Sequence, residues 1–241
     1  MTNPSVSLCF PAYNEEKTIA AVLLEARDLL KEADFDYEVI VCDDASTDKT
    51  GSIIDATRDD FPQLKVIHHT QNKGIRFTFE ELYASAEKEF VFLNSTDGQW
   101  DTAVLLGMLP LTWDWDIIIA SRKKKPYGPL RSIISWGFNL APFLLFGVQT
   151  FDAGAVKLTR RELISRFRII SKSPFNEAER LIRASKAGYR ITTYPVEVAS
   201  RRSGHAHGVK MKLVLQSILD MGLVWWDLNI VHRNELNSRN T

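Results

Sequence analysis

The chain has 241 residues, of which 45% are hydrophobic and 25% are charged, with 30 basic and 30 acidic side chains. This length and composition suit one globular domain that buries a full hydrophobic core. Because the charges balance, no overall field favours nucleic acid, and DNA or RNA binding is not expected.

Five short apolar runs alternate with helical patterns in the first half of the chain. Runs rich in Val, Ile, Leu and Phe favour strands of a parallel sheet that is buried on both faces. The predicted strands are the run beginning at Leu8 and residues 37–42, 64–68, 90–93 and 116–120. The predicted helices are residues 15–31, 48–60, 74–88 and 101–109. This alternation predicts an α/β fold whose mostly parallel sheet is flanked by helices.

The second half of the chain begins with the uncharged stretch from Ser132 to Phe151. It is long enough to span a membrane, but Asn139, Pro142 and Gln149 disfavour a single spanning helix. An interfacial helix or a helical hairpin fits better. A strand near residues 155–158, helices over 160–167 and 176–187, and a strand over 190–198 are predicted to complete the domain.

Residues 208–231 carry a long helical pattern that ends in aromatic side chains, among them Trp225 and Trp226. Basic residues stand before it and at its start. This pattern suits a helix that lies on an anionic membrane surface. A helix packed on the sheet or in a dimer is the alternative, and residues 232–241 are predicted to form a flexible tail.

Cys9 and Cys42 both fall inside apolar strand runs. A thiol in such a run behaves as a small buried hydrophobe, which favours a reducing location on the cytosolic side. The first ten residues show no secretory signal, so the chain is expected to stay on the side where it is made.

Each predicted strand of the first half ends in a polar loop. The carboxyl ends of such strands share one crevice in an open parallel sheet, so these loop residues should converge. They are Asn14, Glu15, Asp43, Asp44, Asn72, Asp97 and Arg122. An acidic cluster would repel a nucleotide diphosphate unless a divalent cation or nearby Lys and Arg offset its charge, so a metal-assisted nucleotide site is predicted. Loops that merely cap helices are the alternative.

The motifs PAYNEE, DDASTDKT, QNKG, STDGQWD and AERLIRASKAGYRI together resemble family 2 glycosyltransferases of the GT-A fold. The segments SRKKKPYGPLRSIISWGFNL and VEVASRRSGHAHG are similar to those of dolichyl-phosphate and polyprenyl-phosphate sugar transferases. The resemblance implies a single domain with a nucleotide-sugar-binding half (1–122), an acceptor half (123–207) and the helix 208–231. It also implies inverting sugar transfer to a polyprenyl phosphate, by a protein held peripherally on the cytoplasmic side of a membrane.

The resemblance further implies a set of donor-site residues. They are Pro11, Tyr13, Asn14, Glu15, Asp43, Asp44, Lys73, Arg76, Gln99 and Arg122. The ring of Tyr13 can lie against a base, a carboxylate such as Asp43 can accept hydrogen bonds from a base or ribose, and Lys73 or Arg76 can meet phosphates.

Asp97 matches the second of two aspartates that the family uses to hold Mg²⁺ or Mn²⁺, and Ser95 stands in place of the first. Magnesium often uses only one or two protein carboxylates together with phosphates and waters, so Asp97 can suffice. Asn94, Ser95 or water would supply the remaining ligands. The departure at Ser95 also leaves open a non-catalytic nucleotide-sugar-binding subunit.

For the acceptor, the resemblance points to Arg131, Arg201 and Arg202, because guanidinium groups match phosphate oxygens in a bidentate fork. Glu179 matches an acidic residue near the acceptor entrance and is preferred to Glu177. With a hydroxyl acceptor on a glycan, small molecule or protein, Glu179 would act as a general base, whereas with a phosphate it would only orient groups. The stretch with His205 and His207 is predicted to be a lid, and no zinc site is expected.

Overall fold

The computed structural model describes residues 3–122, 129–197 and 211–231, with side chains left out of the description for 129–134. A seven-stranded sheet in the order β3-β2-β1-β4-β6-β5-β7 forms its centre. The strands are β1 (Val6–Ala12), β2 (Tyr37–Asp43), β3 (Leu64–His68), β4 (Phe90–Leu93), β5 (Ile117–Arg122), β6 (Lys157–Arg160) and β7 (Ile191–Val196). The α/β fold with a mostly parallel sheet is confirmed.

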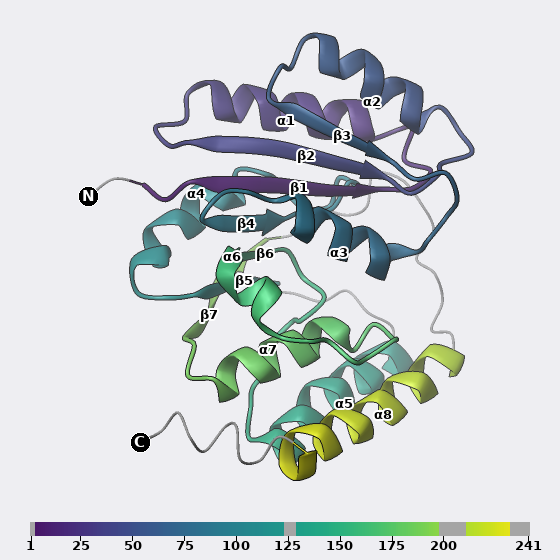
Figure 1. Ribbon diagram of the computed structural model, residues 1–241, viewed down its shortest axis with the longest axis vertical. Helices are drawn as coiled ribbons and strands as arrows, with labels where there is room; N and C mark the ends of the chain where they lie inside the picture. Colours follow the sequence, from purple (N-terminus) through teal and green to yellow (C-terminus); the bar gives the residue numbers. More distant parts are fainter. Residues whose placement is uncertain (1–2, 123–128, 198–210, 232–241) are drawn as a thin grey trace.

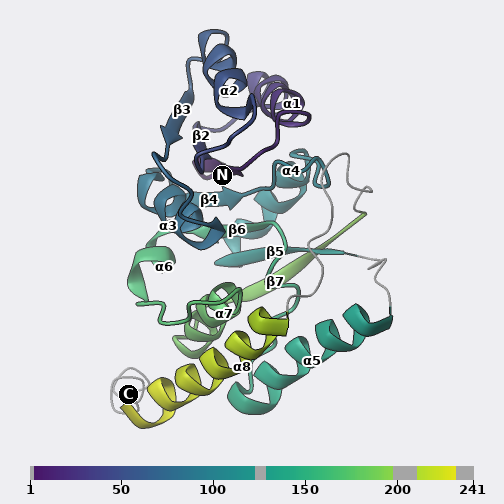
Figure 2. The same cartoon turned by 90° about the vertical axis from the view of Figure 1, so that its right-hand side faces the viewer.

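Helices lie on both faces of this sheet (Figure 1). They are α1 (Ile19–Lys31), α2 (Thr50–Asp59), α3 (Ile75–Ser85), α4 (Val104–Met108), α5 (Pro129–Phe146), α6 (Arg161–Arg166), α7 (Asn176–Lys186) and α8 (Met211–Trp226), with the short helical segments η1 (Leu109–Trp113) and η2 (Asp227–Val231). Figure 2 shows α1 and α4 on one face of the sheet, and α3 and α6 on the other. The two faces have separate apolar clusters, because the strands between them are buried on both sides.

β6 is the one described strand that runs against its neighbours. It pairs antiparallel with β4, where Leu93 faces Lys157, and with β5, where Ile119 also faces Lys157. β5 and β7 are parallel to each other. The first five strands therefore run in one direction, as the sequence predicts, with β6 inserted between β4 and β5.

α5 is a single helix, so the hairpin alternative for residues 132–151 is wrong. The helix continues through Pro142 and ends at Phe146. Gly147 follows it at φ +66°, and its N–H donates to the Phe143 carbonyl oxygen at 2.8 Å. A glycine in the left-handed region is a common helix terminator, because it carries no Cβ to clash there.

α5 and α8 lie side by side at the end of the molecule opposite α1 and α2 (Figures 1 and 2). A third apolar cluster joins them to α7 through Phe146, Ile182 and Val224. α7 also contributes Leu181 to the main core, so it connects the sheet to this helical end of the molecule.

Two buried carboxylates fix the loop between α6 and α7. Glu179 of α7 accepts hydrogen bonds from the N–H groups of Ile170 and Ser171, at 3.0 and 2.8 Å. Asp220 of α8 accepts from the N–H groups of the next two residues, 172 and 173, at 2.9 and 2.8 Å. Since the four N–H groups are consecutive, this loop joins α7 to α8.

Both cysteines are free and buried. Burial raises the pKa of the Cys42 thiol to about 12 and that of Cys9 further, so neither thiol ionises near neutral pH.

Asp220→Asn tests the anchoring of α8. Burial alone would raise the pKa of Asp220, but hydrogen bonds from Ser173, Gln216 and Lys172 outweigh burial and lower it. We expect the variant to lose about 2 kcal/mol of unfolding free energy at neutral pH, the scale of hydrogen bonds to a charged group.

A carboxyl with a lowered folded-state pKa stabilises above its unfolded value of about 4, and this contribution disappears as pH falls through the folded value. The difference between wild type and Asp220→Asn should therefore shrink in acid, measured by chemical denaturation across pH. Asp59→Asn, on the exposed side of α2, is the control and should leave the unfolding midpoint unchanged. A constant difference down to the lowest pH would contradict the anchoring role.

Candidate active site

Side-chain contacts bring the loops after β1, β2 and β4 together. The Asn14 N–H donates to Ser46 Oγ at 2.9 Å, and the Thr47 N–H donates to Asn14 Oδ1 at 2.8 Å. From the loop after β4, Thr96 Oγ1 donates to the Pro11 carbonyl oxygen at 2.7 Å. The predicted convergence of these strand-end loops is therefore observed, and Tyr13 stands in this region with 46% of its surface exposed.

Glu15 and Pro11 stabilise the loop after β1 through internal contacts. The Glu15 N–H donates to Thr50 Oγ1 at 2.8 Å, and Glu15 Oε2 accepts from Thr18 Oγ1 at 3.0 Å. Pro11 is buried at the end of β1. Both residues therefore shape the loop that carries Tyr13.

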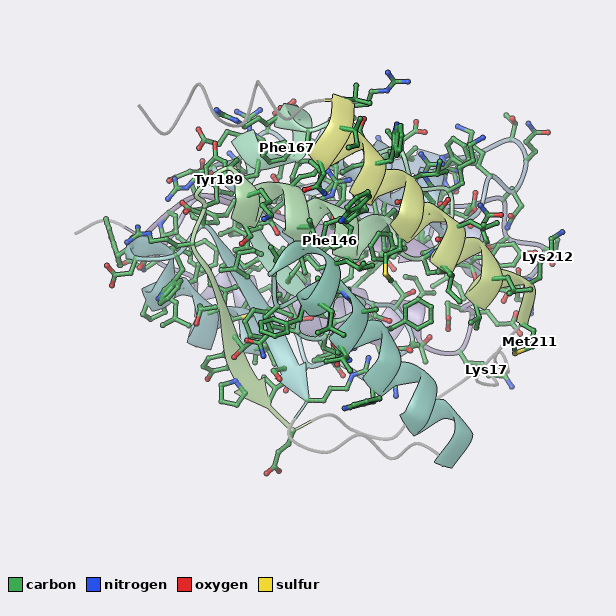
Figure 3. All side chains as sticks on the ribbon, turned by 90° about the horizontal axis from the view of Figure 1, so that it is seen from below. Lys17, Phe146, Phe167, Tyr189, Met211 and Lys212 are labelled. Carbon is green, nitrogen blue, oxygen red and sulfur yellow. The ribbon has the colours of Figure 1, made fainter. Side chains whose placement is uncertain are left out.

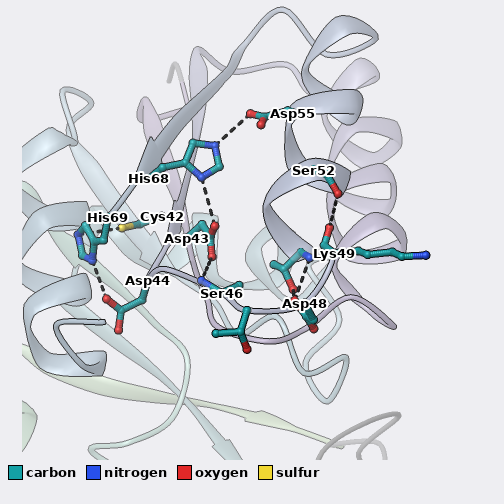
Figure 4. Close-up of polar contacts among 12 residues, drawn as sticks. Cys42, Asp43, Asp44, Ser46, Asp48, Lys49, Ser52, Asp55, His68 and His69 are labelled. Atoms are coloured by element: carbon teal, nitrogen blue, oxygen red, sulfur yellow. Dashed lines mark hydrogen bonds and ion pairs between the residues drawn. The ribbon is translucent and has the colours of Figure 1, made fainter. Parts of the chain in front are cut away.

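Asp43 is buried at the end of β2 and faces His68 at the end of β3. Asp43 Oδ1 accepts from the Ser46 N–H at 3.1 Å, and Oδ2 lies 3.2 Å from His68 Nδ1. Figure 4 shows His68 between Asp43 and Asp55, whose Oδ1 is 3.0 Å from the other ring nitrogen. Burial lowers the pKa of His68, but hydrogen bonds and charge from Asp55 and Asp43 raise it by more, so the net shift is upward.

Asp44 points into the protein and holds the QNKG segment. Its Oδ1 accepts from the Lys73 N–H at 2.8 Å and lies 2.6 Å from His69 Nδ1, and its Oδ2 accepts from the Gly74 N–H at 2.8 Å. Burial would raise the pKa of Asp44, but these hydrogen bonds outweigh it and lower the pKa. An ionised Asp44 therefore positions the loop before α3, and its carboxylate is directed to these internal partners.

The start of α3 carries two cations. Gly74 precedes the helix at φ +85°, and Lys73 Nζ lies 3.2 Å from Glu81 Oε2. The Arg76 guanidinium carbon lies 5.5 Å from the centroid of the Phe77 ring. The N-terminal end of a helix with Lys and Arg beside it suits an anion such as a phosphate.

Asp97 occupies a tight turn after β4. Its Oδ1 accepts from Ser95 Oγ at 2.8 Å and from the Gln99 N–H at 3.1 Å. Gly98, between Asp97 and Gln99, has φ +69°. Asn94 is buried, and its amide oxygen accepts from the Ser95 N–H, so it is poorly placed to complete a metal site.

The oxygen atoms of Asp97, Ser95 and Gln99 are the hard ligands that Mg²⁺ and Mn²⁺ prefer. Within the described ranges, His, Cys, Asp and Glu form no group of three or more that could hold a metal. A divalent ion here would therefore rely on Asp97 together with ligand oxygens and water.

Arg122 ends β5 in contact with two residues that the sequence analysis did not select. Its Nε lies 3.5 Å from Asp152 Oδ2, and its guanidinium carbon lies 5.0 Å from the centroid of the Trp100 ring. Trp100 directly follows Gln99, a predicted donor-site residue, and this position in the sequence could have identified it as a site residue. Asp152 comes just before β6 and had no such signal, because β6 was not predicted to lie beside β5.

Glu179 is wholly buried and does not line an acceptor entrance. Besides the two loop N–H groups, it accepts from Arg183 Nε at 2.8 Å. Glu177 is also buried, where Lys157 Nζ donates to its Oε2 at 2.7 Å. In this conformation neither carboxylate is placed to take a proton from an acceptor hydroxyl, and the general-base expectation for Glu179 does not fit this geometry.

The expected acceptor arginines fall largely outside the described residues. Arg131 belongs to the first turns of α5, where only the backbone is described. Arg201, Arg202, His205 and His207 lie in the segment 198–210, beyond the described ranges.

Comparison with known proteins gives matches over most of the chain. The profile of the glycosyl transferase family 2 matches residues 7–178. An undecaprenyl-phosphate mannosyltransferase of Micrococcus luteus is 28% identical over 214 residues, covering 81% of this chain and 84% of the relative. The dolichyl-phosphate beta-glucosyltransferase ALG5A of Trichomonas vaginalis is 27% identical, covering 80% of this chain and 65% of the relative.

Solved structures match the fold. Glucosyl-3-phosphoglycerate synthase from Mycobacterium tuberculosis, in complex with Mn²⁺, UDP and phosphoglyceric acid, aligns with a TM-score of 0.72 and 19% identity, covering 92% of this chain and 78% of that one. The mannosyltransferase PcManGT from Pyrobaculum calidifontis, with GDP-Man and Mn²⁺, aligns with a TM-score of 0.61 and 20% identity, covering 85% and 59%.

Glu179→Gln separates an internal structural role from general-base catalysis. The amide NH₂ of glutamine would face N–H donors in the loop, so we expect a loss of about 2 kcal/mol of unfolding free energy. The pH dependence of kcat should keep its wild-type shape. Glu162→Gln, on the exposed side of α6, is the matched control. A fall in kcat of about 100-fold or more with an unchanged unfolding midpoint would instead identify Glu179 as a general base.

Proposed function

We propose that this protein, which belongs to glycosyl transferase family 2, moves a sugar from a nucleotide-sugar donor to a polyprenyl phosphate at a membrane surface. The fold is GT-A, and the protein is a glycosyltransferase. The observation that carries the lipid acceptor is the exposed apolar face of α5 and α8. Two relatives whose names state a lipid-phosphate acceptor support the same conclusion.

The donor side of the proposal uses the loops after β1, β2 and β4. Tyr13 is exposed enough for its ring to lie against a base, and Asp43 stands at the end of β2 to fix base or ribose hydrogen bonds. Asp44 would contribute indirectly, because it holds the backbone of the QNKG segment in place. Lys73 and Arg76 would then meet the diphosphate at the start of α3.

The proposed cofactor is Mg²⁺ or Mn²⁺, held by Asp97 with Ser95 and Gln99 nearby. When bound, such an ion supplies positive charge that stabilises the departing nucleoside diphosphate. In the M. tuberculosis structures, the synthase is in complex with Mn²⁺ or Mg²⁺ and UDP.

The acceptor side needs little proton transfer. A phosphate monoester is largely ionised near neutral pH, because its second pKa is about 6. In one displacement, an acceptor phosphate oxygen bonds to the anomeric carbon while the bond to the diphosphate oxygen breaks. The internal position of Glu179 is compatible with this chemistry, since no base is required.

The helical end of the molecule presents the apolar surface that the proposal places on a membrane. Figure 3 views it from below, with α5 and α8 side by side. Large apolar side chains of α5, α8 and η2 are more than a third exposed: Trp136, Phe143, Leu144, Leu145, Met211, Leu213, Leu215, Ile218, Leu219, Leu223, Trp225, Trp226 and Ile230. Many exposed apolar side chains on two adjacent helices are typical of a membrane or protein interaction site.

Among the described helices, one segment is long and apolar enough to cross a membrane. It is Met211–Val231, with 21 residues and a mean hydropathy of 1.2. Its acidic residues favour a helix that lies along the protein: Asp220 holds two loop N–H groups, and Asp227 Oδ2 accepts from an Arg183 NH2 group at 2.6 Å. These contacts support the proposal that the protein is peripheral, with α8 in the interface plane. The cytoplasmic side remains a prediction from the sequence.

A hydroxyl acceptor is the alternative function. This function would need a carboxylate that reaches the acceptor. Both Glu177 and Glu179 are buried and accept hydrogen bonds from groups inside the protein. The phosphate acceptor is therefore preferred.

The transfer reaction tests the proposed function. Purified protein, incubated with UDP- and GDP-sugars, Mn²⁺ and a polyprenyl phosphate, should form a glycolipid. Asp97→Ala should lower its rate by about 100-fold or more, the scale for removing an electrostatic stabiliser of the transition state. Asp101→Ala, in the same loop, is the control. Absence of glycolipid over the whole donor panel would contradict the proposed acceptor.

Vesicle flotation tests the membrane surface. The protein should float with vesicles that contain anionic lipid, and the double variant Leu219→Glu, Leu223→Glu on the exposed face of α8 should remain at the bottom of the gradient. Leu24→Glu, an exposed leucine of α1 at the other end of the molecule, should still float. Equal flotation of all three proteins would exclude this face.

A further inference from the structure

The pair Arg122 and Asp152 lies where the donor half meets α5. Arg122 ends β5, Asp152 precedes β6, and both side chains are 16% exposed. Their contact atoms are 3.5 Å apart, which is an ion pair longer than a typical hydrogen bond. A guanidinium held in such a place can serve an anion as well as its carboxylate partner, because it carries five N–H donors in a planar fork.

The same guanidinium connects this pair to the loop that carries Asp97. It lies against the ring of Trp100, which is only 6% exposed and cannot move without disturbing the core. Trp100 is joined to Gln99, whose N–H donates to Asp97. Asp152 therefore stands one side chain away from the loop that is proposed to hold the metal.

A pocket of about 620 Å³ opens beside the pair, between α5 and the end of β5. We call it the α5 pocket. Its lining combines apolar and polar side chains, namely Ser121, Trp136, Asn139, Leu140, Phe143, Gln149, Phe151 and Asp152. Half of these residues are polar and half are apolar or aromatic, so the pocket could receive a ligand that has both a polar group and a carbon chain.

The backbone before Asp152 is held in an uncommon conformation. Phe151 has φ +51°, and the other non-glycine residues with positive φ in the described ranges are Asn14 and Ala45, which belong to the two donor loops. A left-handed backbone at a bulky residue is strained, and such strain is concentrated at functional sites, where the surrounding structure enforces it. The 151–152 segment shares this property with the donor loops.

Asp152 also differs from the buried carboxylates of α7 and α8. Glu177, Glu179 and Asp220 are almost fully buried and bind internal partners. Asp152 is the one carboxylate among the described residues that line the α5 pocket. A carboxylate on the wall of this pocket would repel a phosphate on its own, but beside Arg122 its charge is compensated.

We infer that Asp152 is a positioning residue, which holds Arg122 against Trp100 so that its guanidinium can bind a phosphate group at the mouth of the α5 pocket. The phosphate belongs to the donor diphosphate or to the acceptor. This inference rests on the proposed function for the identity of the acceptor, but not for the link between Asp152 and Arg122. The apolar wall formed by Trp136, Leu140 and Phe143 would receive the carbon chain next to an acceptor phosphate.

Asp152→Asn is the primary test, because it keeps the shape of the side chain and removes its charge. We expect kcat/KM to fall by about 10- to 100-fold, the usual scale for a residue that orients a binding group, with an unchanged unfolding midpoint. Asp152→Glu, which restores the charge, should recover part of the loss. Because Asp152 acts through Arg122, the two substitutions should not act independently. The double variant Asp152→Asn, Arg122→Lys should have a fall in kcat/KM much smaller than the product of the falls in the two single variants.

The kinetic arms identify the phosphate. A rise in KM for the acceptor alone assigns it to the acceptor, and a rise in KM for the nucleotide sugar assigns it to the donor. If wild-type protein does not use polyprenyl phosphate, the proposed function fails, and binding of UDP and GDP to the same variants by calorimetry still reads the Asp152–Arg122 link.

Two results would overturn the inference. One is independent, multiplicative effects of Asp152→Asn and Arg122→Lys on turnover and nucleotide binding. The other is a change of less than about 2-fold in both quantities, which is below the usual effect of an orienting residue. If Asp152→Asn lowers the unfolding midpoint, Asp152→Ser, which is smaller and also uncharged, takes its place in the double-variant comparison, and wild-type kinetics in that protein would also count against a positioning role.

Discussion

Buried carboxylates that accept backbone N–H groups hold both halves of the proposed site in place. A carboxylate removed from water is costly unless its oxygens receive strong hydrogen bonds. Asp44 meets this requirement with the N–H groups of Lys73 and Gly74, and so determines the path of the QNKG segment. Glu179 and Asp220 meet it with four consecutive N–H groups of the loop between α6 and α7. These contacts fix the start of α3, and they add to the apolar packing that holds α8.

The acidic and polar residues of the proposed site have two different roles. Some are placed to face a ligand, and others hold the loops in position. Tyr13 and Asp97 lie on the open side, whereas Asp44, Asn94 and Glu179 are turned inward. The division explains how a chain with Ser95 in place of an aspartate can keep the geometry of the loop: the serine hydroxyl donates to Asp97 and closes the same turn. The electrostatic demand of a departing diphosphate then falls on Asp97 and on the nearby cations.

Much of the donor half could be predicted from sequence, because strand periodicity and strand-end polarity are local signals. The positions of β1 to β5 and the meeting of their loops followed from them.

The sequence did not indicate which acidic side chains point into the protein. Glu177 and Glu179 carry charges on a helix, which suggests solvent exposure, but Lys157 and Arg183 from neighbouring turns and strands neutralise them inside the protein. Burial would raise the pKa of Glu177, yet Lys157 and Arg180 lower it by more. Asp152 could not be selected because its partner, Arg122, is distant in sequence and depends on strand order.

The reversed direction of β6 has a consequence for the rim of the sheet. Lys157, at the start of β6, stands level with Leu93, near the end of β4. The peptide that enters β6 is consequently delivered to the rim where its neighbours exit, whereas a strand of the opposite polarity would deliver it to the far rim. One inverted strand thus supplies this rim with an additional segment, while the parallel strands and their own loops stay unchanged.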